Sequence, residues 1–264
     1  AYNKGKGIAI KSFPELNESY ARKLTELNPD YVFILDKPVV SNAFFDEAKK
    51  LNLPVVWIDH HDTDSKIPEH VSYYNPSREN RGNEPVTYLS WQLTKRKEDL
   101  WLAVAGCIGD CYMPAFSKDF AEQYEEMWGN VKTPFQALYE TDIGKISRIL
   151  NFALKDRTSN VTRMIRFLIK VSSAREILDD NEKNYVLFRF KQVDSKYQKL
   201  IEKAKSFSKG KIIYFQYGGN LSLSGDIANE LSYRFPGKII VVAYIQGTRA
   251  NISLRGKDIK EITL

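Results

Sequence analysis

The first third of the chain alternates short apolar runs with stretches of helical periodicity. Three continuous apolar runs have the length of strands: Gly7–Ile10, Tyr31–Leu35 and Pro54–Ile58. Two segments between them repeat apolar residues at helical spacing: 16–27, where Asn17 or Ser19 is available as a cap, and 41–51. Strands and helices that alternate at this pace predict βαβ units and a parallel sheet covered on both faces.

The middle and the end of the chain follow different patterns. A helix is expected at Val86–Leu93, and the apolar run Leu100–Asp110 is interpreted as a further strand closed by its aspartate. From about Phe116 to Lys205 the apolar spacing is helical, whereas the last 59 residues return to strands around a helix. We therefore predict an α/β fold with three parts: a parallel-sheet domain at 1–130, a helical connector at 131–205 and a smaller α/β domain at 206–264.

The positive charge of the chain is concentrated in the predicted connector. The whole sequence has 39 Lys and Arg against 33 Asp and Glu, a formal charge of +6. Between Val131 and Gly210 there are 17 basic and 9 acidic residues, so this segment carries +8 and the rest of the chain −2. Arg163, Arg166 and Lys170 share one side of a predicted helix, and we call them the cation stripe. One such stripe is most often a solvated surface, but the wider excess favours a polyanion such as nucleic acid.

Cysteine content and the length of apolar runs bear on where the protein works. Cys107 and Cys111 are the only cysteines in the sequence, too few for a disulfide framework, so a reducing cytoplasm is expected. They flank Asp110 without a second pair, and we interpret them as buried small residues rather than metal ligands. No run approaches the roughly 18 to 20 apolar residues that span a bilayer, and no charged-then-apolar leader is seen, so no membrane partner is expected.

Three apolar runs end in an acid: Asp36, Asp59 and Asp110. Ligands of an open parallel sheet bind beyond the carboxyl ends of its strands, so these side chains would converge on one crevice. Convergent carboxylates repel one another and resist ionisation, and a divalent metal ion removes that repulsion. Carboxylates with one or two imidazoles suit Mn²⁺, Mg²⁺ or Zn²⁺, and the lack of a thiolate set argues against a structural zinc.

Two of the three histidines of the sequence directly follow one of these acids. His60 and His61 leave the strand in different directions, so one imidazole can bind a metal while its neighbour faces a substrate. A single aspartate at a strand end is more often a turn or cap residue than a ligand, but two adjacent histidines after a buried strand favour a site. His70 lies in a polar segment and is expected to be exposed.

These residues carry a family resemblance. Asp59, His60 and His61, which begin 23 positions after Asp36, resemble the signature of the DHH phosphoesterase superfamily, and GCIGD, ending at Asp110, resembles the aspartate motif that follows it. The stretches GGNLSLSGDIANELSYRF and VVAYIQGTRANISLRGKDI resemble the DHHA1 substrate-binding domain. Within the superfamily the chain is most similar to the archaeal RecJ-like, oligonucleotide-degrading branch. The resemblance implies a parallel-sheet DHH domain, a helical connector and a smaller DHHA1 domain.

The resemblance also implies a site for two divalent metal ions, with Mn²⁺ favoured over Mg²⁺. Asp36 would bridge the two ions, and His60 and Asp110 would complete the shell of the second. Asp59 would support the site from close by. His61 would then face the scissile phosphate.

Further candidates, for holding phosphate or nucleotide, lie in the DHHA1-like stretch. They are Arg255, Ser253, Gly219, Asn220, Ser224 and Gly225. A guanidinium such as that of Arg255 can hold phosphate oxygens bidentately. A glycine-rich turn followed by a helix capped by Ser224 explains the last four equally well.

Two motifs of the family have no counterpart. No strand with an Asp-x-Asp loop, the source of ligands for the first metal, precedes Gly7, and no Gly-Gly-Gly-His loop follows ISLRGKDIKEI before Leu264. We expect a sequence cut at both ends, with roughly 40 to 50 further residues, about one βα unit, before Ala1 in the natural protein.

The predicted function is a metal-dependent phosphodiesterase or exonuclease that hydrolyses single-stranded DNA or RNA ends, or short oligonucleotides, by a two-metal mechanism. The cation stripe would contact the nucleic-acid backbone, and replication or repair proteins are expected as further partners. One alternative is a small-molecule phosphoesterase acting on a nucleoside bisphosphate, a cyclic dinucleotide or polyphosphate. The other is a catalytically inactive, replication-associated relative, against which stand the retained acids and histidines.

Overall fold

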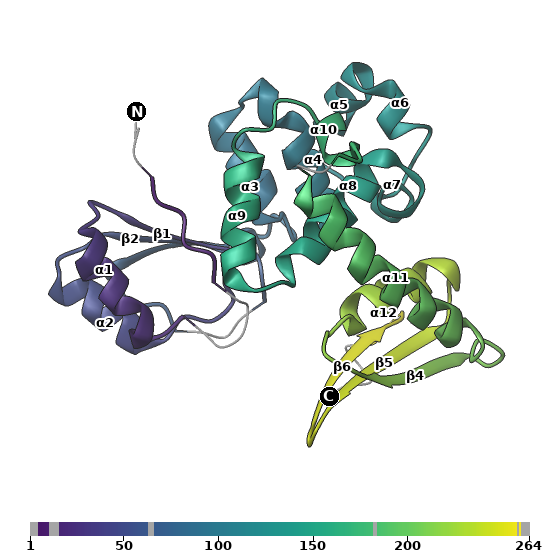
Figure 1. Ribbon diagram of the computed structural model, residues 1–264. Helices are drawn as coiled ribbons and strands as arrows, with labels where there is room; N and C mark the ends of the chain where they lie inside the picture. Colours follow the sequence, from purple (N-terminus) through teal and green to yellow (C-terminus); the bar gives the residue numbers. More distant parts are fainter. Residues whose placement is uncertain (1–4, 11–15, 63–65, 182–183, 258, 260–264) are drawn as a thin grey trace. The chain divides into compact units, whose positions relative to one another are not determined.

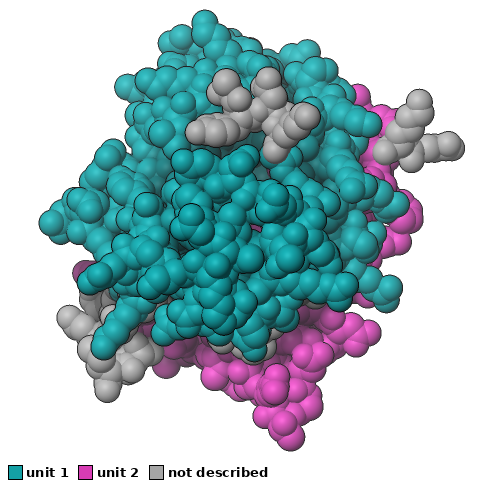
Figure 2. Space-filling view, turned by 90° about the vertical axis from the view of Figure 1, so that its left-hand side faces the viewer, with its two compact units in different colours: residues 1–147, 157–176 teal, residues 148–156, 177–264 magenta. Residues whose placement is uncertain are grey.

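Two compact units make up the computed structural model, which describes residues 5–10, 16–62, 66–181, 184–257 and 259 (Figure 1). The first unit comprises 1–147 and 157–176, and the second comprises 148–156 and 177–264 (Figure 2). The division falls within the helices α8 (Asp142–Leu154) and α10 (Arg175–Leu178). Both units combine helices with a sheet, so the predicted α/β fold class is confirmed.

The first unit contains a parallel sheet of three strands in the order β1-β2-β3. β1 (Val32–Leu35) and β2 (Val55–Ile58) lie in the predicted apolar runs, with α2 (Asn42–Lys50) between them. The hydroxyl of Ser41 accepts a backbone N–H in the first turn of α2 and so caps the helix. β3 (Val71–Tyr74) was not predicted.

The predicted helix before β1 forms as two pieces. They are the 3₁₀ turn η1 (Glu18–Tyr20) and the helix α1 (Ala21–Leu27). Of the two cap candidates, Asn17 is the cap, because its side chain accepts the backbone N–H of Ser19. Figure 1 shows α1 and α2 on one face of the sheet.

The two faces of the first sheet differ in burial. Ile34, Val55 and Trp57 point to the face that α1 and α2 cover and are buried, and the indole Nε1 of Trp57 donates to the carbonyl oxygen of Lys37 at 2.9 Å. On β1 the opposite face exposes Phe33 and Leu35, at 57% and 49%. Cover on both faces was expected, and among the described residues it is absent over β1.

Two segments predicted as strands are not strands. Leu100–Asp110 forms the helix α4 (Leu100–Gly109), and Gly7–Ile10 pairs with no strand in the part of the chain that the structure describes. A continuous apolar run suits a fully buried helix as well as a buried strand, and seven of the ten residues of α4 are buried. Ten residues exceed the usual length of a strand, and the leucines and alanines of α4 favour a helix.

Helices make up the rest of the first unit, as expected for the region after Phe116. They are α3 (Val86–Thr94), α4, α5 (Ser117–Gln123), α6 (Glu125–Trp128), α7 (Pro134–Glu140), the first part of α8 and α9 (Thr158–Leu168), with the 3₁₀ turns η2 (Pro76–Glu79) and η3 (Lys97–Asp99). No described helix combines the length and apolar character needed to cross a membrane.

The second unit has a mixed three-stranded sheet in the order β4-β5-β6. β4 (Ile212–Gly218) runs parallel to β5 (Ile239–Gln246), and β6 (Arg249–Arg255) is antiparallel to β5. The helices α11 (Tyr185–Lys205) and α12 (Ser224–Arg234) belong to the same unit. They are joined by a buried hydrogen bond of 2.5 Å from the hydroxyl of Tyr197 to Glu230. These strands and α12 lie where the apolar pattern predicts them.

One glycine permits a close approach between two helices of the first unit. A Cβ added at Gly144, in α8, would lie 2.5 Å from the carbonyl oxygen of Leu138 in α7 and closer still to that of Ala137. Backbone atoms cannot rotate away as a side chain can, so Gly144→Ala is expected to lower the free energy of unfolding by about 1–3 kcal/mol. Urea unfolding of the variant and its parent measures the loss.

The matched control is Gly7→Ala, because a Cβ at Gly7 would meet nothing within 4 Å. This variant is expected to unfold at the parent's urea concentration. An unchanged midpoint for Gly144→Ala would contradict the close approach of α7 and α8.

Candidate metal centre

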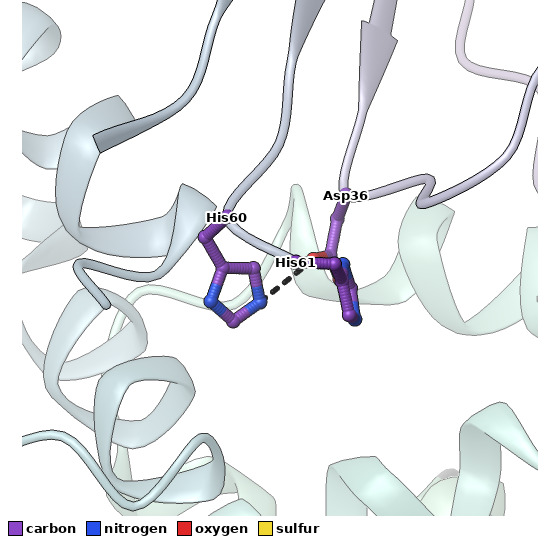
Figure 3. Close-up of side chains that lie close together, drawn as sticks. All are labelled: Asp36, His60 and His61. Carbon is purple, nitrogen blue, oxygen red and sulfur yellow. Dashed lines mark ion pairs between the residues drawn. The ribbon is translucent and has the colours of Figure 1, made fainter. Parts of the chain in front are cut away.

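The carboxyl ends of β1 and β2 bring Asp36 and His60 together. Asp36 follows β1 with a left-handed φ of 56°, and its backbone N–H donates to the carbonyl oxygen of Ile58 at 3.0 Å. The N–H of Asp59 donates to the carbonyl oxygen of Tyr74 at 3.1 Å, which extends the pairing of β2 with β3. The result places Nε2 of His60 3.3 Å from Oδ1 of Asp36 (Figure 3).

Asp36, His60 and His61 form a group with the composition of a metal site. One ligand atom from each residue lies within 4.8 Å of the other two, and no other such group of three occurs in the described part of the chain. The residue His60 is 8% exposed, whereas the side chain of Asp36 is 56% exposed and that of His61 43%. The group therefore combines a buried anchor with two side chains that solvent or a substrate reaches.

Nδ1 of each imidazole is hydrogen-bonded to a side chain from outside the group of three. Nδ1 of His60 donates to Oδ1 of Asn83 at 2.8 Å, and Nδ1 of His61 donates to Oδ1 of Asp59, also at 2.8 Å. Asp59 is fully buried and accepts the backbone N–H of His61 as well. With the proton on Nδ1, each ring keeps the Nε2 lone pair for another partner. One carboxylate and two imidazoles prepared in this way fit a divalent ion such as Mn²⁺ or Zn²⁺.

Opposite charges shift the pKa values of this group. The hydrogen bond between Asp36 and His60 lowers the pKa of the carboxyl and raises that of the imidazole. The carboxylate of Asp59 raises the pKa of His61. The site thus concentrates negative charge beside two imidazoles, which is the electrostatic environment that favours a cation.

Asp110 reaches this environment from a helix. It ends α4, where its backbone N–H donates to the carbonyl oxygen of Gly106 at 3.2 Å. Burial, and then the negative charge of Asp36, raise the pKa of Asp110 to about 6, while the imidazoles oppose the rise. The charge of Asp110 therefore interacts with those of Asp36 and His60, although Asp110 is not among the three grouped candidate ligands. Asp110 follows a helix, so the prediction that it ends a strand was wrong.

Two asparagines at the site were not predicted. Asn83 holds His60, and Asn75, which is 3% exposed, donates from Nδ2 to the carbonyl oxygen of His61 at 2.8 Å. Asn75 also caps η2 by accepting the N–H of Ser77. Asparagine before proline looks like an ordinary turn in the sequence, so the available signal indicated a loop and no partner for a histidine.

The DHHA1-like candidates cluster within the second unit around α12 and β6. The hydroxyl of Ser253 donates to that of Ser224 at 3.0 Å, and a Cβ at Gly225 would lie 4.0 Å from the Ser253 hydroxyl oxygen. Arg255 donates from Nε to the side chain of Asn229 at 2.7 Å. Ser224 is the first residue of α12 and makes no cap hydrogen bond there, so the interpretation of Ser224 as a helix cap is wrong.

Gly219 and Asn220 follow β4 in the same unit. Gly219 has φ of 138°, which only glycine adopts readily, and its carbonyl oxygen accepts the hydroxyl hydrogen of Tyr244 at 2.7 Å. Asn220 is exposed beside it. A glycine-rich turn is therefore present at this position, as one of the two interpretations expected.

The cation stripe belongs to the first unit. Arg163 and Arg166 are exposed on α9, whose other side buries Val161 and Met164. Lys170 is exposed too, but it lies two residues beyond the end of α9 at Leu168. Helical spacing therefore relates the first two cations directly, and the third extends from the turn that follows.

The fold is that of the DHH phosphoesterases, as comparison with solved structures shows. RecJ from Thermus thermophilus, in complex with Mn²⁺, matches with a TM-score of 0.56 and 15% identity over 90% of this chain and 39% of that one. A second exonuclease RecJ, bound to manganese, matches with a TM-score of 0.55 and 15% identity over 94% and 69% of the two chains.

A DHH domain from a protein described as a member of a family of ribosomal proteins matches equally well, with a TM-score of 0.56 and 16% identity over 92% of this chain and 61% of that one. No protein-family model matches the sequence, and no curated protein does. The likeness is thus one of fold, and the chain spans about two fifths of the length of the Thermus protein.

Proposed function

We propose that the protein is a metal-dependent phosphodiesterase that hydrolyses single-stranded nucleic-acid ends or short oligonucleotides. The observation that carries the proposal is the group of one carboxylate and two imidazoles within 4.8 Å, in which a side-chain partner holds Nδ1 of each ring. The presence of manganese in two RecJ structures of the same fold supports Mn²⁺ as the ion.

In this proposal, Asp36, His60 and Asp110 would hold two divalent ions. The bound ions would lower the pKa of a water molecule and stabilise the charge that develops on the phosphate. The chain itself contributes orientation: Asp59 keeps the proton on Nδ1 of His61 and turns the opposite edge of that ring outward. In this proposal the exposed ring of His61, although it belongs to the same group of three, faces the scissile phosphate and not an ion.

The other candidate residues bind the substrate in this proposal. Arg255, Ser253, Ser224 and the glycines Gly219 and Gly225, together with Asn220, hold a phosphate or nucleotide. The support is the direct contact of Ser253 with Ser224 and the fixed direction of the Arg255 guanidinium, which is anchored through Nε. The cation stripe contacts the nucleic-acid backbone further from the reacting bond, and such contacts depend strongly on salt.

The direct test is hydrolysis by the purified full-length protein with Mn²⁺. We expect mononucleotides to be released from short single-stranded DNA or RNA, and less product from a nucleoside bisphosphate at the same concentration. Turnover of the bisphosphate alone would favour the small-molecule alternative. No release from any of these substrates would overturn the proposal.

Reversing the cation stripe separates the oligonucleotide function from the small-molecule alternative. A triple variant, Arg163→Glu, Arg166→Glu and Lys170→Glu, is expected to lower kcat/KM for an oligonucleotide and to leave a mononucleotide substrate unaffected. Loss of up to three phosphate contacts should reduce the salt dependence of oligonucleotide affinity by about 0.7 per contact in log–log slope. Activity measured at several salt concentrations gives both quantities.

The matched control replaces three exposed lysines outside the stripe with glutamate: Lys49, Lys66 and Lys118, all in the first unit. It changes the net charge by the same amount and is expected to retain more of the oligonucleotide activity. Equal losses in the two triple variants would show that net charge alone, and not the stripe, determines the effect.

A further inference from the structure

The two nitrogens of His60 have different neighbours. Nε2 faces Oδ1 of Asp36 at 3.3 Å, and Nδ1 donates to Oδ1 of Asn83 at 2.8 Å. Because an amide oxygen only accepts hydrogen bonds, Asn83 favours the tautomer of the neutral ring that carries its proton on Nδ1. Without a cation, the carboxylate of Asp36 is an acceptor for a proton on Nε2 as well. A cation bound between Asp36 and His60 would take the place of that proton, and Asn83 would then hold the proton that remains on Nδ1.

Asn83 belongs to a tethered segment, residues 75–84. The hydroxyl of Ser77 donates to the carbonyl oxygen of Gly82 at 3.2 Å, which ties the middle of the segment to the residue before Asn83. Arg81 contacts residues at or next to each end of the segment. Its guanidinium donates to the hydroxyl of Tyr74 at 3.3 Å and lies 3.6 Å from the carboxylate of Glu84. The amide of Asn83 is therefore presented by a segment whose backbone is fixed by other contacts.

The same segment contacts both histidines of the site. Asn75, at its start, donates to the carbonyl oxygen of His61, and Asn83, near its end, accepts from the ring of His60. The first bond fixes the backbone that carries the histidine pair, and the second fixes one ring on that backbone. Segment 75–84 thus supports the site although no residue in it is among the grouped candidate ligands.

We propose that Asn83 is a positioning residue of the metal centre, which holds His60 in the tautomer and orientation that present Nε2 to a divalent cation. The inference rests on the proposed function only in taking the site to be a metal site. The two histidines differ in this respect, because a carboxylate holds His61 and a neutral amide holds His60. A carboxylate partner raises the basicity of an imidazole ligand, whereas the amide chiefly orients it.

Without Asn83, the carboxylate of Asp36 would favour a proton on Nε2 of His60, and the ring would rotate more freely. Loss of such a partner typically weakens metal binding about 10- to 100-fold. Asn83→Ala is therefore expected to weaken Mn²⁺ binding by that factor in calorimetric titrations of the full-length protein. Asn83→Asp keeps an acceptor oxygen in place, and it is expected to restore binding to at least the parent's affinity.

The matched control is Asn42→Ala, which removes an exposed asparagine from the start of α2 in the same unit. Its Mn²⁺ affinity is expected to equal the parent's. A second readout is spectroscopic: ¹H–¹⁵N spectra of the imidazole rings with diamagnetic Zn²⁺ bound report which nitrogen of each histidine carries the proton. The Zn²⁺-bound parent is expected to show the Nδ1–H form of His60, and Asn83→Ala a mixture.

Equal Mn²⁺ affinities for the parent and Asn83→Ala would overturn the inference and leave the proposed function intact. A Zn²⁺-bound parent that shows the Nε2–H form of His60, or a parent that binds no Mn²⁺, would also overturn it. If the parent binds Mn²⁺ but hydrolyses no substrate, while Asn83→Ala binds more weakly, the proposed function fails and the inference about Asn83 stands.

Discussion

A His60→Ala variant is expected to lose at least about 1000-fold in kcat/KM for Mn²⁺-dependent hydrolysis, and to bind Mn²⁺ too weakly to measure at micromolar concentrations. The reason is that His60 is the buried anchor of the candidate ligand group, with Asp36 on one nitrogen and Asn83 on the other. Removing a ligand should cost more than the roughly 10- to 100-fold lost with a ligand's hydrogen-bond partner. Steady-state kinetics and calorimetric titration measure the two losses.

His70→Ala is the matched control for this variant. His70 is an exposed histidine of the same unit and lies outside the candidate ligand group. It is expected to retain the parent's kcat/KM and Mn²⁺ affinity. The metal-centre assignment would be wrong if His60→Ala were as active as the parent.

Asp59→Asn is expected to lower kcat by about 10²- to 10⁴-fold while the thermal unfolding midpoint changes little. Asp59 is fully buried and holds Nδ1 of His61, so an amide in its place can turn its N–H toward the ring and move the proton to Nε2. A histidine held in the wrong tautomer has cost a serine protease a factor of about 10⁴. Asp36 and His60 are unchanged in this variant, so its Mn²⁺ affinity should fall less than that of His60→Ala. The loss is therefore expected mainly in kcat.

Kinetics and unfolding of Asp30→Asn provide the comparison for this second variant. Asp30 is exposed and lies before β1, outside the site, so its amide is expected to leave kcat unchanged. A fully active Asp59→Asn protein would show that His61 does not depend on the buried carboxylate, and would remove the proposed role of His61.

The pattern of apolar residues predicted the strands and helices that bury one face. β1 and β2 are continuous apolar runs with the length of strands, and α2 repeats apolar residues at helical spacing, because its buried face packs against the sheet. The pattern was ambiguous for α4, since an element buried on nearly all sides has no polar face to reveal its period. β3 was missed because it has only four residues, near the lower limit for a strand, although valine and tyrosine favour strands.

The candidate site was predictable where strand order alone brings residues together. Parallel strands end at the same edge, so Asp36 and His60 were expected to meet, and they lie 3.3 Å apart. Asn83 and Asn75 could not be found in the same way. They act from an irregular segment whose path depends on tertiary contacts such as those of Arg81, which have no period in the sequence.

The left-handed backbone of Asp36 allows the charge at this position to be changed without changing the shape of the turn. Among residues with a side chain, aspartate and asparagine tolerate φ near 56° best, whereas β-branched residues are strained there. Asparagine would therefore keep the turn at the end of β1 while removing the negative charge next to His60. An Asp36→Asn variant would therefore keep the backbone shape of the parent but not the negative charge at this position. Under the proposed function, it would bind an oligonucleotide without cleaving it, which suits crystallography of the complex.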